Sequence, residues 1–162
     1  MDYWFSAHEV ASLAADMESN GVAFYKHLQG VAGDSTISNM CAFFAAQEEE
    51  HQAKFLAMAE AFRLSVSEQC YSVDVRAMLN ASMLDLARLL DEKPSPERSL
   101  ILVSESLTIA AGVEATAINV FMKMKERYTA IFSSLLTGML AEERKHLRMI
   151  QFVQERLRPT DW

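Results

Sequence analysis

The chain contains few of the residues that interrupt regular secondary structure. Only five of its 162 residues are Gly and three are Pro, whereas 51% are hydrophobic. A protein built from many short strands needs many turns, and Gly and Pro are among the commonest turn residues. Their scarcity argues against a sheet protein. It favours an all-α fold of long helices, as do the ten Met residues, since Met forms helices well.

Positive charge is also scarce. The chain has 15 Lys and Arg against 22 Asp and Glu, a formal net charge of −7, and no basic run. A polyanion such as nucleic acid would meet net repulsion, because recognition of the phosphate backbone depends on clustered positive charge. We therefore expect no nucleic-acid partner.

Signals for export, membrane insertion and disulfide bonding are missing as well. The opening MDYWFSAHEV has no basic segment followed by an apolar one, and Glu105 interrupts the longest apolar stretch. Cys41 and Cys70 are isolated thiols, which suit a reducing compartment better than a disulfide framework. We expect a cytoplasmic protein without a membrane partner.

What the sequence does contain is helical periodicity with recognisable helix starts. Ser6 and Glu9 have the spacing of a capping box, which predicts a helix from Ser6 to about Val31. Asp34 or Ser35 can then cap a second helix, which continues past Phe62 toward residues 65–67.

The connection that follows is long and is expected to hold a short amphipathic helix. It extends from about Ser65 to Pro94. Ser95 then caps a third long helix, with Pro96 at its first position, where the missing N–H costs nothing. No proline follows Pro96 until Pro159.

A single helix over this last region would be roughly 90 Å long, too long for a compact domain of this size. We place a break in the polar stretch 123–129, with Thr129 as the cap of the fourth helix. The prediction is one domain over residues 1–162. It is an antiparallel four-helix bundle with a single long crossover between its two helical hairpins.

The two halves of the chain repeat one pattern of acids and histidines. In each half a lone glutamate is followed by Glu-x-x-His: Glu18, Glu48 and His51 in the first half, and Glu114, Glu143 and His146 in the second. Apolar residues flank every one of the four glutamates at offsets of three, four and seven, which lie on one helix face. All four acids therefore interrupt stripes that face the core.

Four clustered carboxylates in a protein core are costly unless they are neutralised. Two Fe²⁺ ions carry four positive charges and would balance them, while two neutral imidazoles complete the coordination. Mixed carboxylate and imidazole ligation suits iron or manganese better than a closed zinc site. We predict two bound iron ions, which manganese or zinc could replace.

This arrangement resembles the di-iron carboxylate pattern of ferritin-like bundles. The sequence is similar to the rubrerythrin branch, with Met17-Glu18 and Phe24-Tyr25 on the first helix and a Glu-x-x-His on the second. The resemblance covers nearly the whole chain. It implies that Glu48 and Glu143 bridge the metals, that Glu18 and Glu114 are terminal ligands, and that His51 and His146 are the imidazole ligands.

Two departures from rubrerythrins are visible. Ala111 and Ala117 flank Glu114 where rubrerythrins usually carry a further glutamate. No Cys-x-x-Cys pair is present, so the rubredoxin-like iron domain is absent and electrons must come from a separate protein.

The resemblance implies a redox enzyme, a homodimer that reduces hydrogen peroxide or activates O₂. Two alternatives stay open. One is iron handling, as a ferroxidase or in iron storage or delivery. The other is a purely structural or sensory metal site.

Three neighbouring residues have two alternative roles each. Tyr25, two turns beyond Glu18, either hydrogen-bonds near the metals or fills the core, as Phe121 does at the equivalent place. Glu49 and Glu142 are expected to be exposed or to lie behind the ligands.

Overall fold

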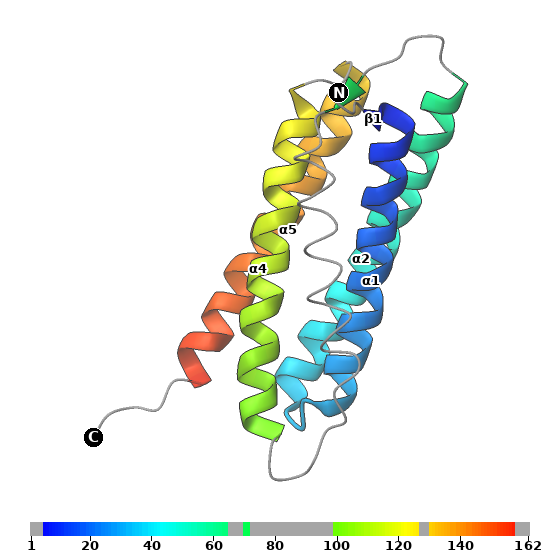
Figure 1. The fold of residues 1–162 in the computed structure, drawn as a ribbon. Coiled ribbons are helices and arrows are strands. Elements are labelled where there is room, and N and C mark those ends of the chain that lie inside the picture. The colour runs from blue at the N-terminus through cyan, green and yellow to red at the C-terminus, as the bar shows by residue number, and fades with distance from the viewer. Residues whose placement is uncertain (1–4, 65–69, 72–98, 127–129, 158–162) are drawn as a thin grey trace.

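Four long helices lie side by side in the computed structural model, which describes residues 5–64, 70–71, 99–126 and 130–157 (Figure 1). They are α1 (Ala7–Val31), α2 (Ser35–Arg63), α4 (Ser99–Lys125) and α5 (Ala130–Leu157). α1 and α2 form one antiparallel hairpin, and α4 and α5 form a second. α4 begins at the opposite end of the bundle from the end of α2. The predicted all-α four-helix bundle is confirmed.

The first helix begins at its predicted cap. The Ser6 hydroxyl accepts a hydrogen bond from the Glu9 backbone N–H, and the Glu9 carboxylate accepts one from the Ser6 N–H at 2.8 Å. Both halves of a capping box are therefore present. Beside it, the two-residue strand β1 (Phe5–Ser6) pairs antiparallel with β2 (Cys70–Tyr71).

The turn between α1 and α2 is short and tightly specified. Gly33 has φ of +61°, a conformation that L side chains rarely adopt. Asp34 then caps α2 by accepting hydrogen bonds from the N–H groups of Thr36 and Ile37. α2 ends at Arg63, two to four residues short of the predicted end at residues 65–67.

The predicted break in the second half of the chain is confirmed. α4 ends at Lys125, within the polar stretch where the break was expected, and α5 begins at Ala130, directly after that stretch. The predicted caps Ser95 and Thr129 and the predicted short helix in the crossover lie outside the described residues.

One part of α4, Val103–Lys125, is long and apolar enough by length and composition to cross a membrane. The same segment supplies Leu107, Val120 and Phe121 to the bundle core, where each has no exposed surface. A core helix of a bundle passes the same test, so this feature is weak support for a membrane span.

The apolar core is divided into two clusters along the bundle. One contains Met17, Phe55 and Phe121, and the other contains Phe24, Phe44 and Leu107 among others. On every helix the six predicted site residues lie between the stretches that supply the two clusters. The fold therefore holds a polar layer midway between two apolar ones.

The contribution of the Asp34 cap to the stability of α2 can be tested by substitution. Replacing Asp34 by Ala leaves the Thr36 and Ile37 N–H groups without their side-chain acceptor and should cost about 1 kcal/mol of unfolding free energy. Urea unfolding of metal-free protein measures the change. Asp16→Ala, at an exposed position inside α1, is the matched control and should cause no comparable loss.

Candidate metal centre

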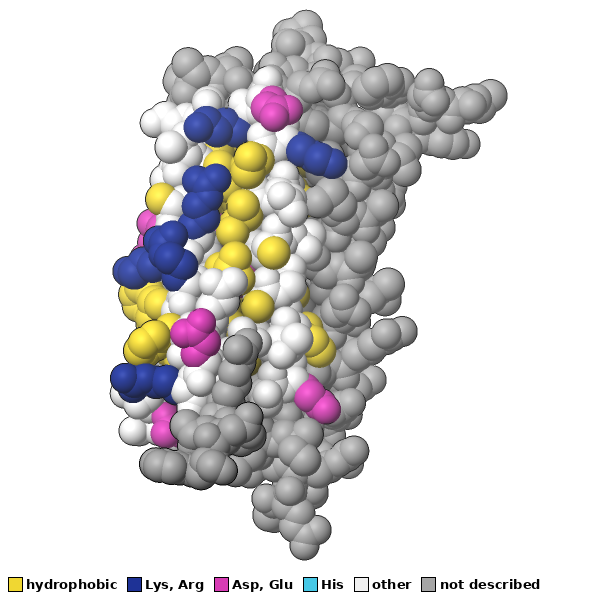
Figure 2. All heavy atoms as spheres, turned by 90° about the vertical axis from the view of Figure 1, so that its left-hand side faces the viewer, with side chains coloured by type: hydrophobic (Ala, Val, Ile, Leu, Met, Phe, Trp, Pro, Cys, Tyr) yellow, Lys and Arg dark blue, Asp and Glu magenta, His cyan; other side chains and the backbone are white. Residues whose placement is uncertain are grey.

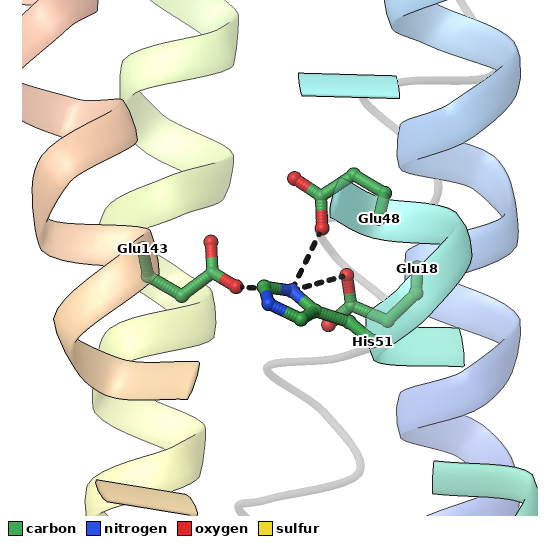
Figure 3. A group of neighbouring side chains, drawn as sticks. All are labelled: Glu18, Glu48, His51 and Glu143. Atoms are coloured by element: carbon green, nitrogen blue, oxygen red, sulfur yellow. Dashed lines mark hydrogen bonds and ion pairs between the residues drawn. The ribbon is translucent and has the colours of Figure 1, made fainter. Parts of the chain in front are cut away.

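The six predicted site residues come together halfway along the bundle. Glu18 comes from α1, Glu48 and His51 from α2, Glu114 from α4, and Glu143 and His146 from α5. The glutamates are 1–4% exposed and the histidines are completely buried. Figure 3 shows four of them pointing toward one another from three helices.

These residues form two overlapping groups, each able to hold a metal ion. One group is Glu18, Glu48, His51 and Glu143, and the other is Glu48, Glu114, Glu143 and His146. Within each group the ligand atoms lie within 4.8 Å of one another. Glu48 and Glu143 belong to both groups, so two ions bound here would share them.

The Nδ1 atom of His51 faces three carboxylate oxygens at once. It lies 2.7 Å from Glu143 Oε1, 3.2 Å from Glu48 Oε2 and 3.9 Å from Glu18 Oε2 (Figure 3). One N–H can donate a good hydrogen bond to only one of them. Three carboxylate oxygens and one imidazole nitrogen that face a common point are an arrangement that could coordinate a metal cation.

His146 repeats this geometry in the second group. Its Nδ1 lies 3.3 Å from Glu48 Oε1, 3.5 Å from Glu143 Oε2 and 3.7 Å from Glu114 Oε1, and it has no hydrogen-bond partner. Oε1 of Glu18 and Oε1 of Glu143 are also buried without a hydrogen-bond partner, the latter despite its closeness to His51. Buried polar atoms are rarely left in this state. The donor set therefore fits two metal ions.

The outer nitrogens of the two histidines are held by polar groups from the opposite hairpin. His51 Nε2–H donates to Glu142 Oε2 at 2.6 Å, and Lys54 Nζ lies 3.6 Å from the same oxygen. His146 Nε2–H donates to Gln47 Oε1 at 2.9 Å. Hydrogen bonds on the outer nitrogen fix the ring and leave Nδ1 to coordinate a metal.

Gln47 has a role that sequence reasoning missed. The signal was present in the repeat, because Gln47 and Glu142 stand immediately before Glu48 and Glu143. Glu142 lies behind a ligand, one of its two expected placements. Glu49 is exposed and pairs with Lys26 at 2.6 Å.

Tyr25 has both of the roles that were left open for it. Its ring is buried against Phe24 and Phe44, each with a centroid distance of 5.1 Å. Its hydroxyl donates a hydrogen bond to Glu114. Burial, reinforced by the charge of Glu114, raises the pKa of Tyr25 well above its ordinary value, so it remains a donor. Phe121, at the equivalent position, packs against Phe55 instead.

The terminal glutamates are difficult to ionise without metal. Burial, with the negative charge of Glu48, raises the pKa of Glu18 well above its ordinary value. Burial and the charge of Glu143 do the same to the pKa of Glu114. We therefore expect both carboxyl groups to carry protons in the metal-free protein.

The two shared glutamates and the two histidines, in contrast, favour their charged forms. Burial would raise the pKa values of Glu48 and Glu143, and the charge of Glu143 would add to this at Glu48, but the adjacent histidines and terminal glutamates lower both. Burial would lower the pKa values of the histidines, but the adjacent glutamate carboxylates raise that of His51 to about 10 and that of His146 to about 12. Without metal, the histidines therefore favour their positively charged form and the shared glutamates their negatively charged form, so opposite charges face each other in the cluster.

A small cavity adjoins the carboxylates on the side of α1 and α4. Its volume is about 10 Å³, and Gly21, Tyr25, Glu114 and Ala117 contribute to its lining. This volume accommodates about one water-sized molecule. A Cβ added at Gly21 would lie 3.4 Å from Cγ of Glu48, so the glycine keeps this side of the site open.

Comparison with protein-family models, with curated proteins and with solved structures gives no match. The chain's own geometry supports a buried site that could hold metal ions, in a bundle compatible with a ferritin-like fold.

Proton release is the first test of the site. Binding two divalent ions should displace two imidazolium and two carboxylic protons, about four in all near pH 7. Apparent affinity should therefore rise steeply with pH, and metal should raise the melting temperature. Titration with Zn²⁺ in weakly buffered solution measures the protons.

The matched control is the Glu48→Ala,Glu143→Ala variant, which lacks both shared carboxylates and should lose both ions. Equal metal binding by this variant, or binding by the parent with neither proton release nor a change in melting temperature, would contradict the site.

The outer hydrogen bonds give a second test. A carboxylate that accepts the outer hydrogen bond of a histidine makes its other ring nitrogen a stronger metal ligand than an amide acceptor does. His51 has the carboxylate of Glu142 and His146 has the amide of Gln47, so the ion on the His51 side should bind more tightly. Glu142→Gln should weaken the tighter binding step about tenfold. Gln47→Glu should instead strengthen the weaker step.

Stepwise calorimetric titration with Co²⁺ separates the two binding steps. Glu49→Gln, an exposed position on α2, is the control. The idea fails if both variants shift the same step or if neither shifts any.

Proposed function

We propose that this chain is a di-iron redox protein that reduces hydrogen peroxide with electrons from a separate carrier protein. The observation that carries the proposal is the pair of overlapping buried ligand groups that share two glutamates. In it, Glu48 and Glu143 bridge the ions, Glu18 and Glu114 are terminal ligands, and His51 and His146 complete the two sites.

Iron is favoured over a structural metal by the donor set. Four carboxylates and two imidazoles are a set of oxygen and nitrogen ligands without thiolate, which iron and manganese accept. Two ferrous ions also balance four carboxylates, so the loaded cluster is as neutral as the protonated one. The resemblance to rubrerythrins supports the same metal.

A small oxidant is favoured by the cavity. The cavity beside the glutamates, which Gly21 and Ala117 help to line, holds about one water-sized molecule. An organic substrate is far too large for it, so only the smallest oxidants, such as H₂O₂ or O₂, are candidates. Two bound iron(II) ions supply the two electrons that H₂O₂ + 2 H⁺ + 2 e⁻ → 2 H₂O requires. The Tyr25 hydroxyl holds its proton and orients Glu114 at the cavity wall.

The alternative is a ferroxidase or another iron-handling protein, because the same ligands would bind ferrous iron as a substrate. The two functions differ in whether the iron stays. The predicted homodimer and the predicted cytoplasmic location stay predictions.

Rapid mixing separates the two functions. Peroxide should oxidise the anaerobic, reduced protein faster than O₂ at equal concentration, and one equivalent per site should suffice. Reductant should then restore the site without loss of iron. Faster oxidation by O₂, with uptake of far more than two irons per chain, would instead establish iron handling.

The cavity provides a further variant for the same experiment. Gly21→Ala should keep the iron but slow oxidation by peroxide at least severalfold, because the added methyl group narrows the space beside Glu48. Gly112→Ala is the matched control, since a Cβ there meets nothing within 4 Å. Equal rates in both variants would show that the oxidant does not use this cavity.

A further inference from the structure

The outer surface between α2 and α5 carries an apolar groove of about 480 Å³. Its lining includes Met40 and Phe43 from α2 and Met149 and Phe152 from α5. Phe43 is 42% exposed and Phe152 is 54% exposed, which is unusual for side chains of this size. An exposed apolar surface with a polar border is typical of an interaction site.

The border of this groove is positively charged, although the chain has a net charge of −7. Lys145 and Arg148 line the groove, and among the residues that the structure describes no acidic side chain does. Lys145 Nζ lies 5.1 Å from the centre of the Phe43 ring, and Arg156 stacks over Phe152 at 4.6 Å. Figure 2 shows Lys and Arg side chains along one edge of the face formed by α4 and α5, with hydrophobic side chains among them.

The groove reaches almost to the candidate metal centre. The ring of Phe43 meets the ring of His146 edge-on, with 6.4 Å between centroids. His146 is fully buried and follows Lys145 directly in the chain. One exposed aromatic ring therefore connects the groove with a histidine of the site.

We propose that the groove between α2 and α5 is the docking surface for an acidic electron-carrier protein, and that Phe43 is the contact through which electrons reach the centre. This inference rests on the proposed function and gives it a location. The reduced cofactor of the carrier transfers electrons to the metal centre one at a time. Two such transfers reduce the centre, and the carrier cofactor is oxidised by the same number of electrons. Charge complementarity would steer the carrier, while the apolar floor would stabilise the complex.

A second copy of this chain fits the groove less well. A two-fold contact centred there would oppose the groove to itself and bring Lys145 and Arg148 near their own symmetry mates. Like charges facing each other across an interface are unfavourable. An acidic partner has no such cost.

The test uses iron-loaded, oxidised protein and a reduced acidic flavodoxin as the probe, in stopped flow at low salt. Lys145→Glu,Arg148→Glu should lower the second-order rate of reduction at least tenfold, and added salt should reduce the difference. Lys123→Glu,Lys125→Glu, at the end of α4, changes the net charge equally and should have a much smaller effect. Dithionite should reduce all three proteins at similar rates.

Phe43→Leu tests the route itself. It keeps the floor of the groove apolar, so flavodoxin affinity should be nearly unchanged, while the limiting rate at saturating flavodoxin should fall severalfold. Iron content and helical circular dichroism establish that each variant is folded. Lys145→Gln,Arg148→Gln, a milder change, should show a smaller loss of rate in the same direction.

Several results would overturn the inference. One is an equal loss of rate in the two charge-reversed variants, and another is an unchanged limiting rate for Phe43→Leu. A third is a parent dimer that Lys145→Glu,Arg148→Glu converts to monomer in sedimentation, which would assign the groove to a second copy. Binding of oxidised flavodoxin needs no turnover, and peroxide oxidation needs no carrier, so a failure of docking is distinguishable from a failure of the proposed function.

Discussion

Neutrality of a buried acidic layer is the constraint on which the rest of this structure depends. Four glutamates in a helix bundle cannot all be ionised without compensating charge. The geometry allows two solutions with the same total charge. Four protons distributed over two histidines and two glutamates give one, and two divalent cations give the other. The same buried side chains can serve both states.

Much of this could be predicted from the sequence because the relevant signals are local or repeated. The Ser6 and Asp34 caps depend on residues three apart or fewer: the Ser6 cap was predicted, and Asp34 was one of the two residues predicted to cap the second helix. The buried positions of Glu18 and Glu114 follow from helical periodicity, since each interrupts an apolar stripe. The doubled Glu-x-x-His then predicted which residues would meet across the bundle.

The missed features depend on the relative rotation of helices, which periodicity does not determine. Gln47 reaches a histidine 99 positions away, and the choice of Glu114 as the partner of Tyr25, whose hydrogen bond near the metals was one of two predicted roles, also depends on how α1 faces α4. The groove at Phe43 was not predicted either, because a single exposed aromatic residue on a helix carries no distinctive pattern. Such contacts are set by how the two hairpins pack against each other.

The way in which the two ligand groups draw on the two hairpins has a mechanical consequence. Neither hairpin contains a complete group: the first lacks Glu143, and the second lacks Glu48. An ion in the first group would thus link α1 and α2 to α5, and an ion in the second group would link α4 and α5 to α2. Both ions would cross-link the two hairpins midway along the bundle. Loss of the ions would loosen the junction between hairpins before it affected either hairpin itself. On unfolding, we would expect the two hairpins to separate from each other before either hairpin unfolds.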